Sequence, residues 1–205
     1  MRLIAAALLF LAVCHAAKAQ ATGEPTLSAE LLQKGAWEFG PEIGGGPSTR
    51  YNIPATAQFL YFGGRIGRVL SGPRLHDWRR GRFEMAADIL PFYKAYTSGG
   101  TVYGGSFRPL VCQWNFEGGR HVAPYISLSG GVLFTTRNIP PGNTSPVNFT
   151  PGGAFGTRVF TGRKAAIFIE TSVLHMSNAN LGVRNPGYPI SILFNVGYTW
   201  FKRPK

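Results

Sequence analysis

The sequence predicts an all-β fold, an eight-stranded antiparallel barrel that crosses a lipid bilayer. Composition is the first observation, because 27 glycines, 15 prolines and an aromatic content of 13% favour strands and turns over helices. The second is the alternation of apolar and polar residues along successive segments, as expected for the two faces of a strand. The third is the even count of about eight such segments of about ten residues each, which matches the smallest closed membrane barrels.

The expected strands follow one another at near-regular spacing. The last one shows the alternation most clearly, with Ile192, Phe194 and Val196 on one face and Ser191 and Asn195 on the other. The expected strands cover residues 36–44, 58–70, 82–91, 107–116, 122–134, 149–160, 165–174 and 190–201. Loops or turns are expected near 72–73, 98–105 and 140–146, and only the segment 27–34 has a helical pattern.

Two architectures explain the alternation. A soluble sandwich or lipocalin-like carrier would turn the apolar face inward, whereas an outer-membrane barrel turns it outward to lipid. The polar face carries charges of both signs interleaved with glycines, as a narrow barrel interior would require: Glu38, Glu42, Arg65, Glu84, Asp88, Arg158 and Glu170. The apolar face carries aromatic residues near strand ends, typical of an interfacial girdle. We therefore favour an eight-stranded antiparallel outer-membrane β-barrel over the soluble carrier.

The N-terminal segment has the pattern of a secretory signal peptide. Arg2 precedes an apolar run over 3–14, and Ala17-Lys18-Ala19 fits a small-x-small cleavage site. We expect residues 1–19 to be the signal and residues 20–205 to form a single β-barrel domain. A lipoprotein signal ending at Cys14 is the alternative. If Cys14 leaves with the signal, the mature chain keeps one cysteine and has no internal disulfide.

The chain is strongly basic. Its formal net charge is +12, and removal of the two basic residues of the signal leaves 19 basic against 9 acidic residues, a charge of +10. In an exported protein this charge indicates contact with anionic surfaces such as phosphorylated lipid headgroups rather than with nucleic acid. A plain role in solubility or interfacial anchoring is the alternative.

His175 and Ser177 form the candidate catalytic pair. Residues two apart in a strand share a face, so the imidazole and the hydroxyl lie side by side, as a nucleophile and its base do in acyl hydrolases. Both share the parity of the apolar Ile167, Ile169 and Val173, which places the pair on the lipid-facing wall. On spacing alone, an ordinary solvated histidine at a strand end is the more common explanation.

A resemblance strengthens the catalytic interpretation. The run Leu-His-Met-Ser-Asn-Ala over 174–179, the turn Asn185-Pro186-Gly187 and the aromatic-rich last strand resemble the outer-membrane lipid A 3-O-deacylases of the PagL family. The resemblance implies an eight-stranded barrel with its active site on the outer wall, level with one leaflet. It also implies hydrolysis of an ester-linked acyl chain on the glucosamine disaccharide of lipid A.

The resemblance assigns roles to four residues. Ser177 would be the nucleophile, His175 the base, and Asn178 a donor of the oxyanion hole. Arg184 in the following loop would contact a lipid A phosphate. The alternatives are a turn-capping role for Asn178 and an ordinary solvated side chain for Arg184.

One position departs from the family pattern. Family members orient the histidine with a glutamate near the start of the last strand, but residues 188–191 here read Tyr-Pro-Ile-Ser, and no acidic residue follows Glu170. Glu170 itself has the parity of the barrel interior. The remaining candidates for the orienting group are Asn180, Asn185, Ser191 and a backbone carbonyl. A non-catalytic barrel with a structural or surface-binding role is therefore the second hypothesis.

We expect no cofactor and no metal, since ester hydrolysis needs only water. The mature histidines are far apart and lack the spacing of metal ligands, and the glycine runs lack the context of phosphate-binding loops. The expected partners are lipid A (lipopolysaccharide) and the bilayer of the bacterial outer membrane, with no nucleic acid. The sequence leaves both a monomer and a homodimer open.

Overall fold

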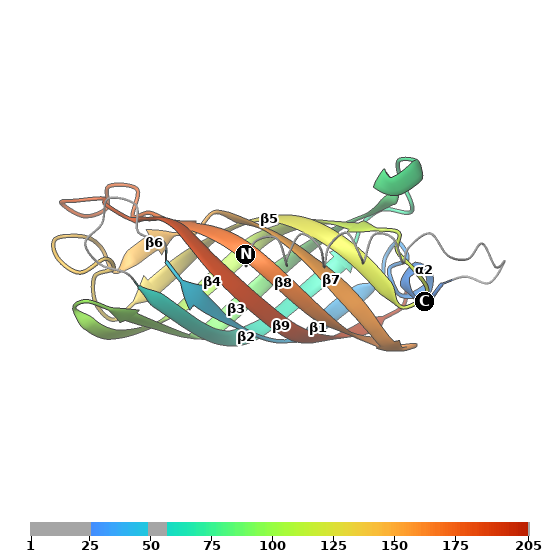
Figure 1. Ribbon diagram of the computed structural model, residues 1–205, viewed down its shortest axis with the longest axis horizontal. Helices are drawn as coiled ribbons and strands as arrows, with labels where there is room; N and C mark the ends of the chain where they lie inside the picture. Colours follow the sequence, from blue (N-terminus) through green and yellow to red (C-terminus); the bar gives the residue numbers. More distant parts are fainter. Residues whose placement is uncertain (1–25, 49–56, 205) are drawn as a thin grey trace, which may run out of the picture.

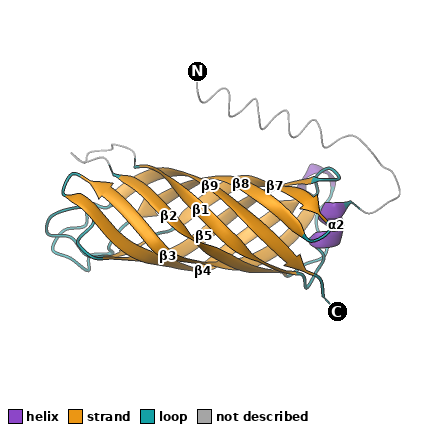
Figure 2. Cartoon of the chain, turned by 90° about the horizontal axis from the view of Figure 1, so that it is seen from below, coloured by secondary structure: helices purple, strands orange, loops and turns teal. Residues whose placement is uncertain are grey.

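The computed structural model describes residues 26–48 and 57–204, so the expected signal peptide lies outside the described residues. The chain forms an elongated barrel with strands inclined to its long axis (Figures 1 and 2). The strands are β1 (Trp37–Pro47), β2 (Gln58–Val69), β3 (Gly81–Thr97), β4 (Gly100–Phe116), β5 (Val122–Thr135), β6 (Val147–Phe149), β7 (Gly152–Gly162), β8 (Ala165–Met176) and β9 (Tyr188–Lys202). Two short helices, α2 (Leu27–Leu31) and the 3-10 helix η1 (Asp77–Arg79), lie at the same end of the barrel.

The sheet closes on itself. Every neighbouring pair of long strands is antiparallel, with β9 beside β1 and β4 beside β5, so the eight long strands among the described residues leave no open edge. The three residues of β6 add a short pairing to β5 outside this ring. The predicted fold class, an eight-stranded antiparallel barrel, is confirmed.

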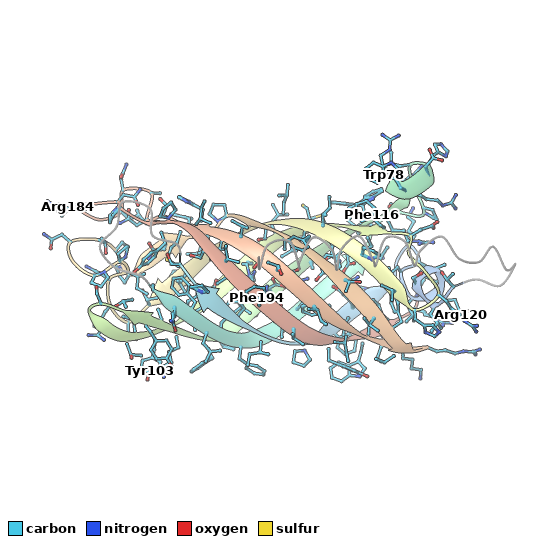
Figure 3. The ribbon with its side chains drawn as sticks, in the orientation of Figure 1. Trp78, Tyr103, Phe116, Arg120, Arg184 and Phe194 are labelled. Atoms are coloured by element: carbon cyan, nitrogen blue, oxygen red, sulfur yellow. The ribbon has the colours of Figure 1, made fainter. Side chains whose placement is uncertain are left out.

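The wall of the barrel alternates as predicted. In β9, Phe194 is 61% exposed on the outside, whereas Ser191 and Asn195 are buried inside. Tyr103 points away from the outer wall in the same manner (Figure 3). Because the apolar side chains face outward all round the barrel, the lipocalin-like arrangement, which needs them inside, does not fit the structure.

The middle of the barrel is filled by a buried network of charges, as the polar face predicted. Arg158 contacts Glu38 at 2.6 Å and Glu84 at 2.8 Å. Arg65 pairs with Asp88 at 2.7 Å. Each of these three carboxylates has a guanidinium partner, which offsets the cost of taking both ions out of water.

Two apolar clusters close the interior on either side of the charged network. At one end, Leu31 and Leu32 pack with strand residues Val69, Phe160 and Phe201. The helix α2 thus closes this end of the barrel. Thr26 is the N-cap of the helix, and its side-chain oxygen accepts a hydrogen bond from Ala29 N at 3.1 Å. At the other end a larger cluster includes Phe59, Tyr93, Ile139, Met176, Tyr188 and Leu193. The sequence predicted the polar interior and the helix, but not these two apolar clusters.

Most strand boundaries differ from the prediction by a few residues, and the difference is large in two places. The expected loop over 98–105 is mostly strand, because β3 and β4 continue as a long hairpin in which Lys94 pairs with Tyr103 and Thr97 with Gly100. Its glycine and threonine content suggested a loop, but inward Val102 and outward Tyr103 keep the alternation. The expected strand 149–160 is divided into β6 and β7 around Thr150-Pro151, where proline lacks the N–H that a ladder needs.

The two ends of the barrel carry different connections. The long β5–β7 and β8–β9 connections and the short β3–β4 turn lie at one end, which we call the long-loop end. The short β4–β5 and β7–β8 connections, the longer β2–β3 connection, α2 and the C-terminus lie at the other end (Figure 1). In outer-membrane barrels the end with short turns faces the periplasm and the end with long loops faces outward. No helix among the described residues has the length and apolar character needed to cross a membrane.

Candidate active site

His175 lies in an irregularity of the β8–β9 pairing, at the end with long loops. Leu174 pairs with Ser191 and Met176 with Tyr188, so two residues of β9 oppose the single residue His175. On its other side, His175 N donates to Pro151 O at 2.9 Å. Such bulges re-aim one side chain, and here the imidazole is exposed on the lipid-facing wall, as its parity predicted.

A backbone carbonyl orients the imidazole. His175 Nδ1 lies 3.0 Å from Pro189 O. Since a carbonyl oxygen only accepts, Nδ1 carries the proton in this contact, and the Nε2 lone pair is left as the basic site. Of the orienting groups that the sequence allowed, the structure therefore supplies the backbone carbonyl. Glu170 is buried inside the barrel, where the Tyr125 hydroxyl (3.0 Å) and Asn195 Nδ2 (2.8 Å) donate to it.

Ser177 sits just beyond β8, where Phe149 extends the ladder. Ser177 N donates to Phe149 O at 3.0 Å, and Phe149 N donates to Ser177 O at 2.6 Å. The Ser177 hydroxyl contacts the Asn185 side chain rather than His175: Asn185 Nδ2 lies 3.0 Å from Oγ, and Oδ1 lies 3.2 Å from it. Ala179 N donates to the same Oγ at 3.2 Å. Two N–H groups therefore converge on the candidate nucleophile.

The Asn185 amide is held in this orientation by the backbone. Its Oδ1 accepts a hydrogen bond from Asn178 N at 3.0 Å, which turns Nδ2 toward Ser177. Gly187, two residues later, has φ +56°, a backbone conformation that suits glycine, and a Cβ there would lie 2.3 Å from Met176 O. The Asn-Pro-Gly turn thus fixes both the amide beside Ser177 and the start of β9.

Asn178 is engaged within the loop. Its side chain is buried, Nδ2 donates to Arg184 O at 2.9 Å, and Oδ1 accepts from Asn180 N at 3.0 Å. These contacts match the turn-capping alternative for Asn178. Arg184 is exposed at the tip of the β8–β9 loop, with its side chain directed away from the barrel wall (Figure 3). The structure therefore brings His175, Ser177 and Asn178 together and leaves Arg184 at the periphery.

Two groups at the site, the Ala179 N–H and the Asn185 side chain, were not assigned these roles by the sequence, and the orienting carbonyl was expected without its residue. The Ala179 N–H and the Pro189 carbonyl are backbone groups, whose positions residue types do not predict. Asn185 was a candidate for orienting the histidine, and the structure places it beside the serine instead. Its signal was the Asn-Pro-Gly turn. Among residues 26–48 and 57–204, no three metal-binding side chains form a group.

A barrel with an apolar outer wall is typical of an outer-membrane protein, and the histidine, the serine and the converging N–H donors at its rim form a candidate site. The chain matches the family model described as "Lipid A 3-O-deacylase (PagL)" over residues 26–199 and belongs to this family. Membership identifies it as a protein of the bacterial outer membrane from a family of enzymes that act on lipid A. No match was found among curated proteins.

Solved structures share the fold at low sequence identity. The crystal structure of the outer membrane enzyme PagL has a TM-score of 0.51 and 17% identity, covering 81% of this chain and 99% of that one. The outer membrane protein OprG from Pseudomonas aeruginosa has a TM-score of 0.53 and 11% identity, covering 84% and 98%. The N-terminal barrel domain of OprF from the same organism has a TM-score of 0.50 and 15% identity, covering 82% and 98%. At these identities the likeness concerns the fold alone.

Proposed function

We propose that this protein is an outer-membrane esterase that hydrolyses an ester-linked acyl chain of lipid A, with Ser177 as nucleophile and His175 as base. The observation that carries the proposal is that a backbone carbonyl orients the His175 imidazole. Pro189 O fixes Nδ1 at 3.0 Å and leaves Nε2 as the basic nitrogen on the lipid-facing wall, two residues from a serine. A solvated strand-end histidine would need neither the bulge nor this contact.

The reaction begins with a rotation of the Ser177 side chain. Its hydroxyl leaves Asn185 and turns toward His175 Nε2; hydrogen bonds at catalytic sites often form only when substrate is bound. Nε2 takes the proton while Oγ attacks the acyl carbonyl carbon. The oxyanion that forms is stabilised by donors already near the serine, Asn185 Nδ2 and Ala179 N–H.

The tetrahedral intermediate then collapses. The bond to the sugar oxygen breaks, and that oxygen takes the proton from the His175 imidazolium, which releases the deacylated sugar. Water, deprotonated by the same Nε2, attacks the acyl-serine and releases the fatty acid. Serine and histidine return to their initial protonation states.

The carbonyl of Pro189 differs from a carboxylate in one respect. It selects the tautomer and the ring orientation, but as a neutral group it stabilises the imidazolium less. Because the charge on the orienting group contributes to turnover in Ser-His-Asp enzymes, we expect slower turnover here than in a barrel with an acidic partner. The geometry therefore supports a Ser–His dyad.

The position of the site fits a lipid substrate. His175 is exposed on the same wall as Ile167, Ile169 and Val173, near the end that carries the long loops. An acyl chain can reach this wall from within the bilayer while its sugar headgroup lies level with the loops. No channel through the barrel is needed for substrate to arrive.

The test is mass spectrometry of lipid A from outer membranes that contain the wild type or Ser177→Ala. We expect the wild type to remove one hydroxyacyl group and Ser177→Ala to slow this by about 10³-fold or more. Heat-dependent gel migration shows that both barrels are folded. Identical lipid A from cells with folded wild type and folded variant would contradict the esterase and favour the non-catalytic barrel.

A further inference from the structure

The end of the barrel that carries α2 also carries all four tryptophans of the chain. Trp37 opens β1, Trp114 and Trp200 lie near the ends of β4 and β9, and Trp78 lies in η1. On the outer wall the Arg68 guanidinium lies over the Trp37 ring, 5.3 Å from its centre. Tryptophan is enriched where a membrane protein meets the headgroups of a leaflet.

The same end holds most of the positive charge. Its exposed basic residues are Lys34, Arg68, Arg74, Arg79, Arg80, Arg120, Arg163, Lys164, Lys202 and Arg203, and the described acidic residues there that are not buried are Glu30, Asp77 and Glu117. The long-loop end has only Lys94, Arg137 and Arg184 among the described basic residues. We call the basic residues of the α2 end, together with the four tryptophans, the basic girdle.

The β2–β3 connection extends the girdle away from the barrel. Trp78 is 80% exposed and Leu75 is 54% exposed, on a turn that projects sideways from the wall (Figures 1 and 3). Leu75 and Asp77 have φ of 62° and 55°, a conformation that non-glycine residues rarely adopt. An apolar residue held in this conformation and exposed indicates a surface that meets something other than water.

The projecting turn is fixed to the barrel. Trp114 Nε1 donates to Arg79 O at 3.1 Å, and Arg80 pairs with Glu117 at 2.6 Å. A backbone bridge between Arg74 and Gly81 closes its base. The turn therefore presents Leu75, Trp78 and the neighbouring arginines in one fixed arrangement.

We propose that the basic girdle binds anionic phospholipid headgroups of the leaflet that surrounds the α2 end. Trp78 and Leu75 enter the interface, and Arg74 and Arg79 bind lipid phosphates. A lipid partner is favoured because the girdle continues the lipid-facing wall and its charge is opposite to that of the headgroup. The inference concerns the end of the barrel away from His175 and does not depend on the proposed esterase.

Intrinsic fluorescence tests the proposal, since every tryptophan reports on this end. The full-length mature protein is folded into vesicles of phosphatidylcholine mixed with phosphatidylglycerol, with brominated acyl chains on one lipid or the other. We expect brominated phosphatidylglycerol to quench several-fold more strongly than its molar share predicts. We expect about 1 M salt to remove most of this preference, because it screens charges beyond a few ångströms.

A pair of matched variants locates the binding. Arg74→Gln/Arg79→Gln removes two charges from the girdle and leaves Arg80 and Arg82 on Glu117. Lys94→Gln/Arg137→Gln removes two charges from the opposite end. We expect the first variant to lower the preference for phosphatidylglycerol several-fold and the second to leave it unchanged, with both barrels folded by gel migration. Quenching by each brominated lipid in proportion to its molar share in the wild type, or an equal loss of preference in both variants, would overturn the proposal.

Discussion

At the scale of single residues, the site depends on which amide side chain faces the Ser177 hydroxyl. Two asparagines are close in sequence and in space, but they have different partners. Asn185 Nδ2 reaches Ser177 Oγ, whereas the Asn178 side chain bonds Arg184 O and Asn180 N. The family resemblance assigned the oxyanion role to Asn178, and residue type alone does not distinguish two amides seven residues apart.

Replacement of the two asparagines separates their roles. We expect Asn185→Ala to lower kcat by about 10²- to 10³-fold with little change in KM, as for the loss of one oxyanion donor. Asn178→Ala loses two hydrogen bonds of the loop, so we expect faster proteolysis between β8 and β9 and a smaller decrease in kcat. Deacylation of lipid A in detergent micelles and limited proteolysis measure the two effects. The reverse order of the two kcat values would assign the oxyanion role to Asn178.

At the scale of the elements, the period of two along the strands predicted most of the barrel. Alternation identifies a strand whichever face is apolar, and a closed ring of lipid-facing strands repeats it throughout. The hairpin over 93–104 was not predicted, because its glycines and threonines are typical of a loop. The bulge at His175 and the identity of the orienting carbonyl, that of Pro189, were not predicted for a different reason. Their geometry depends on the pairing of β8 with β9, which no single segment encodes.

If His175 and Ser177 act as proposed, the turn before β9 should be as important for activity as their side chains. A Cβ at Gly187 would meet Met176 O at 2.3 Å, so we expect Gly187→Ala to push β9 away from β8 and to displace the Pro189 carbonyl from His175. Deacylase activity should fall at least about tenfold, because small displacements of a catalytic group have large kinetic effects.

A glycine without close neighbours provides the control for this experiment. Nothing lies within 4 Å of a Cβ at Gly162, at the far end of β7, so Gly162→Ala should retain full activity. Both variants should stay folded by gel migration. Full activity in Gly187→Ala would show that the bulge and the carbonyl do not position His175.

At the scale of the whole molecule, the barrel has three layers along its axis: a charged middle and an apolar cluster at each end. The lipid-facing wall gains stability from the transfer of its outward apolar side chains from water into lipid, but contact with a fluid lipid does little to specify how the strands pack against one another. The interior must therefore contribute much of the specificity of the fold. Arg158 is central to it because it connects Glu38 on β1, Glu84 on β3 and Asn115 on β4 from its own position on β7.

Removal of Arg158 should therefore destabilise the barrel more than removal of an exposed arginine. Arg158→Ala leaves two buried carboxylates without their partner, and we expect the free energy of unfolding to fall by about 3–5 kcal/mol. Arg203→Ala breaks the pair with Glu30, whose side chains are 44% and 28% exposed, and should cost less than about 1 kcal/mol. Urea unfolding of the wild type and both variants, monitored by tryptophan fluorescence, measures these changes in the free energy of unfolding. An equal decrease in the free energy of unfolding for the two variants would contradict this prediction. It would mean that water enters the interior and solvates Glu38 and Glu84, so that the apolar clusters at the two ends do not close the barrel.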